Sequence, residues 1–247
     1  MLDINKLMCQ IKHWQNSKTI YSIHSPYIFN YLQFVFDKNR VYYPFIALER
    51  ANSKKTEKIF TPTTDKRLNQ RPDISKFSKQ VIFRHLIKTN AHNFLSIGCQ
   101  TTQILNYVQY SGIKNAIAVE PMHNENHPHP FDRDNKSTSI SIFKSFADLE
   151  TKYKSTRIDT ICIGSPFSLS EAEADKILQL SSDDGSCIIL RPYEMEPSIR
   201  SKIESKYPLI ISTYSMQIMM RSYTGQAQKV LFTTQSWSKP WVLIHAL

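Results

Sequence analysis

The segment at residues 93–102 constrains the fold of this chain more than any other. Asn93 to Ile97 form an apolar run, Gly98 follows directly, and a helix is expected to begin just after it. A second apolar run, residues 115–119, ends at Glu120. A strand, a glycine turn, a helix and a second strand ending in an acid are the parts of a nucleotide-binding βαβ unit, in which the acid binds ribose hydroxyls.

The chain from residue 91 to 247 continues this alternation. Strands are predicted at 93–97, 115–119, 139–143, 157–163, 186–191 and 209–213, with helices between most of them. Two further strands, 215–221 and 228–235, are predicted to pair as a hairpin around Gly225. We therefore expect an α/β fold: a doubly wound, mostly parallel, Rossmann-like sheet with an antiparallel C-terminal hairpin.

Residues 1–90 are predicted to be a helical extension. Helices are expected at 2–15, from Pro26 onward, at about 43–59 and around 74–86, and residues 61–73 are expected to be a polar loop. Ser25 is a good N-cap and Pro26 a good first helical residue. The helix after them carries a buried stripe at helical spacing, formed by Ile28, Tyr31, Leu32, Val35 and Phe36.

The net charge of +10 comes entirely from this extension. Residues 1–90 hold 16 Lys and Arg against 6 Asp and Glu, whereas residues 91–247 hold 15 of each kind. Such a basic segment predicts an acidic partner, which could be a nucleic acid, a membrane surface or an acidic protein. A lysine-rich surface that is merely solvated is an equal alternative.

The cysteines and the hydropathy pattern indicate a cytoplasmic protein. The four cysteines are isolated, so reduced, buried thiols fit better than disulfides or a zinc site. No apolar run reaches the roughly 18 residues of a membrane span, and the first residues show no secretory h-region.

Several short stretches together resemble a known family. They are His24-Ser25-Pro26-Tyr27-Ile28-Phe29, Tyr42-Tyr43 with Glu49-Arg50, residues 81–86 (Val-Ile-Phe-Arg-His-Leu), Leu95-Ser96-Ile97-Gly98, and residues 157–163 (Arg-Ile-Asp-Thr-Ile-Cys-Ile). In this order they resemble class I S-adenosylmethionine (SAM)-dependent methyltransferases, and more narrowly bacterial methyltransferase-like proteins related to small-molecule O-methyltransferases. The resemblance implies that the N-terminal helices form a lid over the substrate.

The resemblance also implies where a cofactor would bind. The residues at the family's cofactor positions are Ser96, Gly98, Cys99, Gln100, Glu120 and Phe146. Ser96 replaces the acid expected two residues before the glycine, and Gln100 and Thr102 stand where further glycines would allow closer approach. In metal-dependent members, acids at the ends of the fourth and fifth strands bind a cation. Here Gly164 and Arg191 stand there, so no metal is expected.

These departures leave two main hypotheses. The first is a methyltransferase-fold protein that has lost catalysis and acts as a binding or scaffold component. The second is an active, metal-independent methyltransferase with His24 or Tyr193 as the general base. For His24, helix capping is the simpler explanation.

Two weaker ideas remain. Aromatic residues interleaved with Lys18, Lys38 and Arg40 raise a nucleic-acid-associated role. The loop 121–131 holds three histidines and Glu125, but its three prolines indicate an extended segment without rigid ligand geometry.

Overall fold

The computed structural model describes residues 23, 25–37, 39–46, 48, 74–98, 101–119, 138–153, 156–164 and 169–232, without the side chains of 101–103 and 150–152. The predicted helix at 2–15, the loop at 61–73 and the histidine-rich loop at 121–131 lie outside these residues. Within them, eight strands form one sheet in the order β3-β2-β1-β4-β5-β7-β6-β8. Their bounds are β1 Asn93–Ile97, β2 Asn115–Val119, β3 Ser139–Phe143, β4 Ile158–Ile163, β5 Ser181–Leu190, β6 Leu209–Ser212, β7 Met216–Met220 and β8 Gln228–Leu231.

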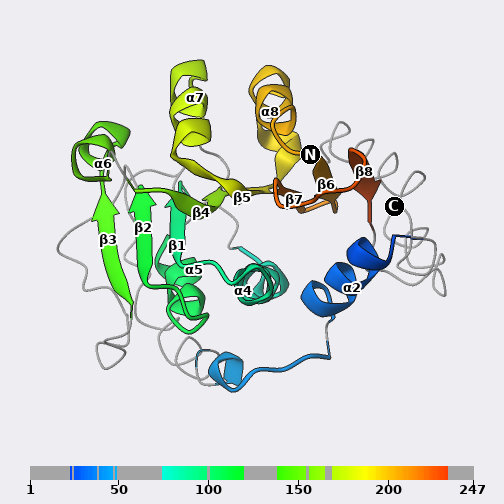
Figure 1. Ribbon diagram of the computed structural model, residues 1–247. Helices are drawn as coiled ribbons and strands as arrows, with labels where there is room; N and C mark the ends of the chain where they lie inside the picture. The colour runs from blue at the N-terminus through cyan, green and yellow to red at the C-terminus, as the bar shows by residue number, and fades with distance from the viewer. Residues whose placement is uncertain are drawn as a thin grey trace, which may run out of the picture.

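The strand directions confirm the doubly wound, mostly parallel sheet. Strands β1 to β5 pair in parallel, and β7 runs antiparallel to both β5 and β6. Parallel neighbours need helical crossovers, and Figure 1 shows helices on both sides of the sheet. The order reverses between β1 and β4, which makes the carboxyl ends of these strands the expected ligand crevice.

The C-terminal end of the sheet does contain an antiparallel hairpin, but it is formed by β6 and β7 and not by the two strands predicted to pair. Strand β7 pairs with β6, whereas β8 pairs in parallel with the other edge of β6, so the predicted pairing of 215–221 with 228–235 is wrong. The reason is local. The turn between β6 and β7 is tight, with the Thr213 N–H donating to the Met216 carbonyl at 2.7 Å. The connection from β7 to β8 at 221–227 is long enough to cross to the free edge of β6.

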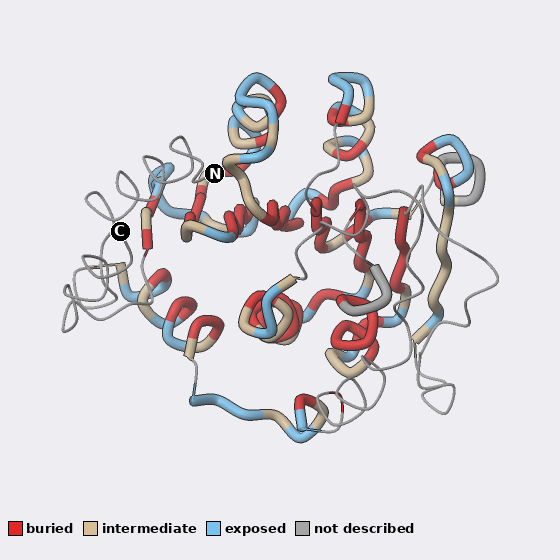
Figure 2. Tube along the Cα trace, turned by 180° about the vertical axis from the view of Figure 1, so that it is seen from behind, coloured by how far each residue is buried: buried red, intermediate tan, exposed pale blue. Residues whose placement is uncertain are grey.

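The helices form two layers. The helices α6 (Phe146–Tyr153), α7 (Glu171–Leu180) and α8 (Pro197–Glu204) cover one face of the sheet, and α2 (Pro26–Val35), α4 (Lys76–Thr89) and α5 (Thr101–Val108) cover the other (Figure 1). A short 3-10 turn, η2 (Pro192–Glu194), follows β5. In Figure 2 the central strands are red along their length, whereas the helices are red mainly on one side. Each layer therefore buries one apolar stripe against the sheet.

Helix α2 begins as its sequence predicts. The Ser25 hydroxyl accepts a hydrogen bond from the Ile28 N–H, and Pro26 occupies the first turn. All five residues of the predicted stripe are buried. Helices α2 and α4 belong to the same core cluster as the sheet, while the division of the chain at residue 90 stays a prediction.

The polar segment Asp183-Asp184-Gly185 lies inside β5. The pairing with β4 jumps from Ile158–Ser181 to Thr160–Ser186, so extra residues of β5 bulge out of register. A Cβ on Gly185 would come within 2.8 Å of the hydroxyls of Ser181 and Ser182. Only glycine fits this bulge without a shift of those side chains.

Candidate functional site

The first part of the candidate site is the carboxyl end of β1. Gly98 has a φ of 60°, and its N–H donates to the Val119 carbonyl at 2.9 Å. The Gly164 N–H donates to the Ile97 carbonyl at 2.8 Å, which joins the end of β4 to the same turn. The positive φ explains the single glycine that the turn retains, because other residues rarely adopt it. The first turn thus begins at a glycine with positive φ, where the missing side chain leaves room for another group to approach the backbone.

Ser96 is the side chain that stands out at this end of the sheet. It is fully buried, and its Oγ has no hydrogen-bond partner among the described residues. A buried hydroxyl without a partner is destabilising by roughly 1–3 kcal/mol. It is placed where the resemblance predicts contact with a cofactor, and the sequence alone gave no sign that the hydroxyl would lack a partner.

The other predicted cofactor residues divide into two groups. Cys99, Gln100 and Glu120 lie outside the described residues, as does His24. Phe146 starts α6 and is only 6% exposed, packed in the core cluster on that face of the sheet. Its ring therefore supports the core, and little of it is open to a ligand.

The ends of β4 and β5 carry Gly164 and Arg191. Arg191 has a φ of 50°, its N–H donates to the Ser215 carbonyl at 2.9 Å, and its Nη1 lies 3.7 Å from Glu194 Oε1. A guanidinium at this position repels a divalent cation, and glycine supplies no side-chain ligand. Within the described part of the chain, no group of three His, Cys, Asp or Glu residues could hold a metal ion.

Tyr193, one of the two candidate bases, lies beside Arg191. Its ring stacks on Tyr214 with centroids 5.1 Å apart and planes 15° apart. Burial, followed by the nearby Tyr214 and Glu194, raises the pKa of Tyr193 well above its usual value. A phenol that is harder to ionise is a poor general base at neutral pH, although it can still donate a hydrogen bond.

Asp159 and the buried cysteines are not part of the candidate site. The Asp159 carboxylate accepts hydrogen bonds from the backbone N–H groups of His92 and Asn93 at 2.8 and 2.9 Å, which fixes the start of β1. Cys162 and Cys187 are free and buried, as predicted, and Cys9 and Cys99 lie outside the described residues.

A buried polar chain, which the sequence did not reveal, links the helices to the sheet. The Tyr31 hydroxyl is hydrogen-bonded to His85 Nδ1 at 2.6 Å, His85 Nε2 to Ser186 Oγ at 2.7 Å, and Ser186 Oγ to Thr160 Oγ1 at 2.9 Å. Burial lowers the pKa of His85 to about 3, so the imidazole is neutral. Ser186 and Thr160 pair near the start of β4, away from the carboxyl edge, so this chain is not part of the candidate site.

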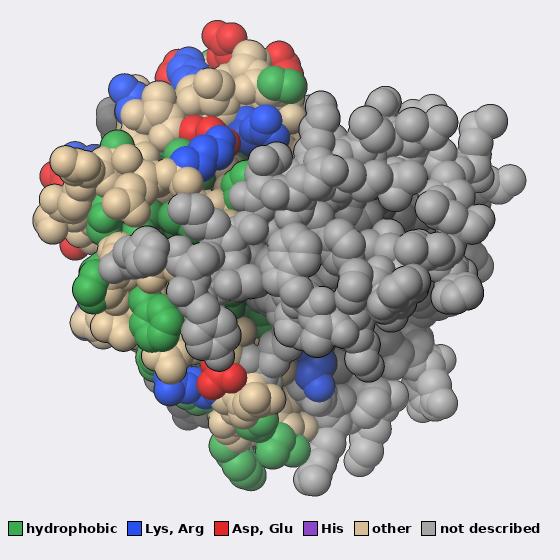
Figure 3. All heavy atoms as spheres, turned by 90° about the vertical axis from the view of Figure 1, so that its right-hand side faces the viewer, with side chains coloured by type: hydrophobic (Ala, Val, Ile, Leu, Met, Phe, Trp, Pro, Cys, Tyr) green, Lys and Arg blue, Asp and Glu red, His purple; other side chains and the backbone are tan. Residues whose placement is uncertain are grey.

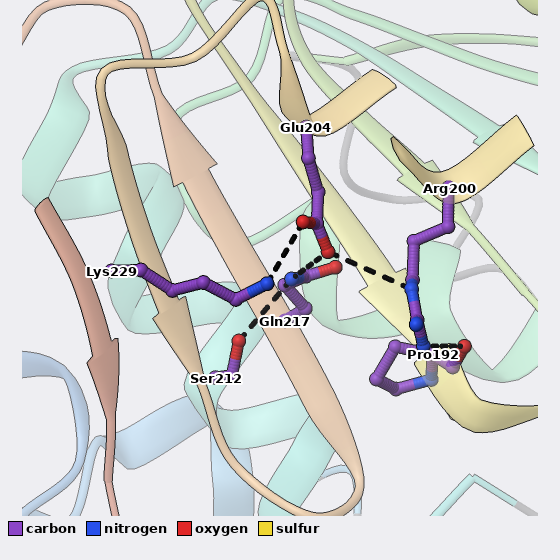
Figure 4. A network of polar contacts seen from close by, with 6 residues as sticks. All are labelled: Pro192, Arg200, Glu204, Ser212, Gln217 and Lys229. Atoms are coloured by element: carbon purple, nitrogen blue, oxygen red, sulfur yellow. Dashed lines mark hydrogen bonds and ion pairs between the residues drawn. The ribbon is translucent and has the colours of Figure 1, made fainter. Parts of the chain in front are cut away.

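A second polar network lies on the opposite face of the sheet, between α8 and the last three strands (Figure 4). Glu204 accepts hydrogen bonds from Gln217 at 2.7 Å and from Lys229 at 2.9 Å, and Arg200 Nε lies 3.6 Å from it. The Gln217 amide also donates to the Ser212 hydroxyl at 3.2 Å. The network ties α8 to the edge of the sheet.

Comparisons with known proteins identify the fold. No protein-family model and no curated protein sequence matches the chain. Among solved structures, a methyltransferase from Geobacter sulfurreducens aligns over 81% of this chain and 98% of its own, with a TM-score of 0.50 and 9% identity. An O-methyltransferase from Bacillus cereus, solved with S-adenosylhomocysteine (SAH), covers 77% of this chain and 94% of its own, with a TM-score of 0.49 and 13% identity.

A further match, a proposed SAM-dependent methyltransferase from Streptococcus mutans, covers 52% of this chain with a TM-score of 0.38 and 17% identity. This chain spans only 38% of the length of that protein. At such identities a likeness shows the fold and not the activity. The chain has the Rossmann-like fold of class I SAM-dependent methyltransferases, as the resemblance in its sequence implies.

Proposed function

We propose that this chain is a methyltransferase-fold protein that binds its ligand or partner without catalysing methyl transfer. The observation that carries this proposal is Arg191 at the end of β5, with Gly164 at the end of β4, where a metal-assisted site needs carboxylates. Tyr193 adds to it, because the raised pKa of this phenol disfavours proton abstraction from an acceptor hydroxyl. Fold alone would not decide the matter, since one fold hosts many functions.

The same edge fits an S-adenosyl ligand in part. The Ser96 hydroxyl could accept from the ligand's ammonium, the turn at Gly98 allows backbone approach, and Glu120 is the predicted partner of the ribose hydroxyls. When bound, SAM supplies a methyl group on a sulfonium. A neutral hydroxyl holds an ammonium less strongly than a carboxylate does, so we expect weaker binding than an acid at residue 96 would give.

Calorimetric titration with SAM, and separately with SAH, tests ligand binding. We expect micromolar or weaker binding that is lost in Glu120→Ala and retained in Glu171→Ala, an acid-to-alanine control at an exposed position of α7. No heat and no thermal shift at millimolar ligand would remove the S-adenosyl part of the proposal. The search would then move to macromolecular partners of residues 1–90.

The second candidate function is metal-independent methyl transfer, favoured by the retained positive-φ turn at Gly98. Here proximity would supply most of the catalysis, and His24 would be the base. The discriminating assay follows SAH formation from SAM with a panel of phenolic acceptors, in the presence of a chelator. Turnover that falls in His24→Gln would overturn the non-catalytic proposal, and absence of turnover with SAM bound would support it.

A further inference from the structure

The outer apolar patch, formed by Val41, Tyr43 and Ile46, is the surface feature that the candidate site leaves unexplained. These side chains are 65%, 85% and 43% exposed. They belong to the segment formed by residues 39–46 and 48, which lies outside the helical layer of α4 and α5 at the lower edge of Figure 1. Figure 3 shows hydrophobic side chains gathered at this lower edge of the molecule.

The segment already has an apolar inner face, so the patch is a second one. Phe45 and Leu48 point inward and are buried against Phe83 of α4 and Tyr107 of α5. Tyr43 and Ile46 have the same three-residue spacing on the outer side. A helical turn that covers a core needs only one apolar stripe, and a second, exposed stripe typically marks an interaction surface.

The support beneath the patch is well packed. The Phe45 and Phe83 rings lie 4.9 Å apart in an edge-to-face contact. Arg84, which is fully buried, donates to the Val35 carbonyl at 3.1 Å and to the Arg40 carbonyl at 2.9 Å. The guanidinium thus holds the chain where α2 ends and the segment begins, and the patch has a fixed position on the fold.

Two exposed cations lie over the ring of Phe34, and one of them, Arg40, directly precedes Val41 of the patch in the chain. The Arg40 guanidinium lies 4.4 Å, and Lys88 Nζ 5.4 Å, from the centre of the Phe34 ring. Neither cation forms an ion pair with a described carboxylate. Of the described acids, Asp37 is close to Arg40 in the chain, and its Oδ1 accepts a hydrogen bond from the Asn39 N–H at 2.9 Å. The patch thus combines aliphatic, aromatic and cationic groups within the part of the chain that carries the whole +10 charge.

We propose that the outer apolar patch binds the surface of an anionic lipid bilayer. Val41 and Ile46 would enter the headgroup and acyl boundary, Tyr43 would lie at its polar level, and Arg40 and Lys88 would contact lipid phosphates. A single-stranded nucleic acid fits less well, because two of the three exposed side chains have no flat ring for a base and cations already flank Phe34. Among the described residues, no helix is long and apolar enough to cross a membrane.

Co-sedimentation of the full chain with vesicles tests the proposal. One vesicle population is phosphatidylcholine alone, and the other contains 30% phosphatidylserine. We expect binding to the second population that weakens with added salt. Arg40→Gln with Lys88→Gln should reduce the partition constant about 30-fold, from roughly 1 kcal/mol for each cation near the surface. Lys202→Gln with Lys206→Gln, in α8 and just after it on the opposite side of the sheet, is the charge-matched control and should leave binding within about twofold.

The apolar half of the patch needs its own variant. Tyr43→Ser with Ile46→Ser should reduce vesicle binding at least about tenfold while circular dichroism and the unfolding midpoint stay near those of the parent, because both side chains are exposed. Binding that is unchanged in this variant, or equal for neutral and anionic vesicles, would overturn the proposal. Binding of an oligothymidylate that is lost in Tyr43→Ser, without vesicle binding, would overturn it in favour of a nucleic-acid partner.

Discussion

The two polar networks on opposite faces of the sheet show how differently one fold can use polar side chains. The chain from Tyr31 through His85 to Ser186 and Thr160 is buried and neutral. The network around Glu204 is charged, and its Lys229 arm is half exposed. The first takes the place of apolar packing between α4 and the sheet. The second holds α8 against the last strands at the edge of the sheet.

The neutral network is the one that mild acid should weaken, whereas the charged network should withstand it. His85 is neutral only because burial lowers its pKa to about 3, so protonating the unfolded chain at mildly acidic pH already opposes folding. Glu204 is charged. Burial raises the pKa of its carboxyl, but hydrogen bonds from Lys229 and Gln217 and the charges of Lys229 and Arg200 outweigh this and lower it. Its contribution is lost only in stronger acid.

Breaking the buried chain at its centre should have the largest effect. His85→Ala removes both ring hydrogen bonds, leaves the Tyr31 hydroxyl without its partner and creates a cavity, so we expect a loss of about 3 kcal/mol in the free energy of unfolding. Urea denaturation measures it. Lys88→Ala, one turn later on the exposed side of α4, is the control and should change stability by less than about 0.5 kcal/mol. A loss below about 1 kcal/mol in His85→Ala would contradict the stabilising role given to these buried hydrogen bonds.

The second largest effect should come from a fall in pH, which affects the two networks differently. Between pH 7 and pH 5 the unfolded chain binds a proton at His85 and the folded chain does not, so stability falls as the pH falls, by about 2 kcal/mol from this residue. His85→Gln can keep hydrogen bonds to both hydroxyls without titrating. The measurement is urea denaturation at a series of pH values, and the difference between parent and His85→Gln should shrink toward pH 5. A difference that stays constant with pH would refute the buried neutral imidazole.

The elements of the fold were predictable from sequence because their signals are local. The bounds of β1, β2 and β3 agree with the predicted ranges, and the cap at Ser25 and Pro26 marks the start of α2. The networks were not predictable, because their partners are far apart in the chain. His85 and Ser186 are separated by 101 residues. The strand order at the C-terminal end was not predicted for the same reason, since β8 pairs with β6 although β7 lies between them in the sequence.

The candidate site was predictable only as far as the resemblance reaches. Gly98 could be located from the turn that it opens, and Arg191 from the position where an acid is expected. That the Ser96 hydroxyl lacks a partner, and that Tyr193 stacks on Tyr214, depend on neighbouring strands and loops that meet only in the folded chain. The roles of Glu120 and His24 stay predictions.

Disrupting the charged network should lower the free energy of unfolding by less than breaking the buried one. Glu204→Gln keeps the shape of the side chain but weakens the contacts with Lys229 and Arg200, so we expect a loss of about 1 kcal/mol near pH 7 and low salt. Because the pKa of Glu204 is lowered on folding, this contribution is full above the ordinary carboxyl pKa and disappears as the pH falls through the folded value. Denaturation of parent and variant should therefore converge in acid and at high salt, and a gap that widens there would be contrary evidence.

The exposed ion pair between Asp175 of α7 and Lys202 of α8 is expected to contribute least to stability among these charged contacts. Its atoms approach to 2.8 Å, closer than in the Glu204 pairs, yet the side chains are 51% and 34% exposed. Water screens such charges, and holding two long side chains in one geometry opposes the attraction, so Asp175→Asn should change stability by less than about 0.5 kcal/mol. The measurement is the unfolding midpoint in urea at low salt, beside Glu204→Gln. A larger loss in Asp175→Asn than in Glu204→Gln would mean that distance, and not burial, decides the strength of ion pairs on this face.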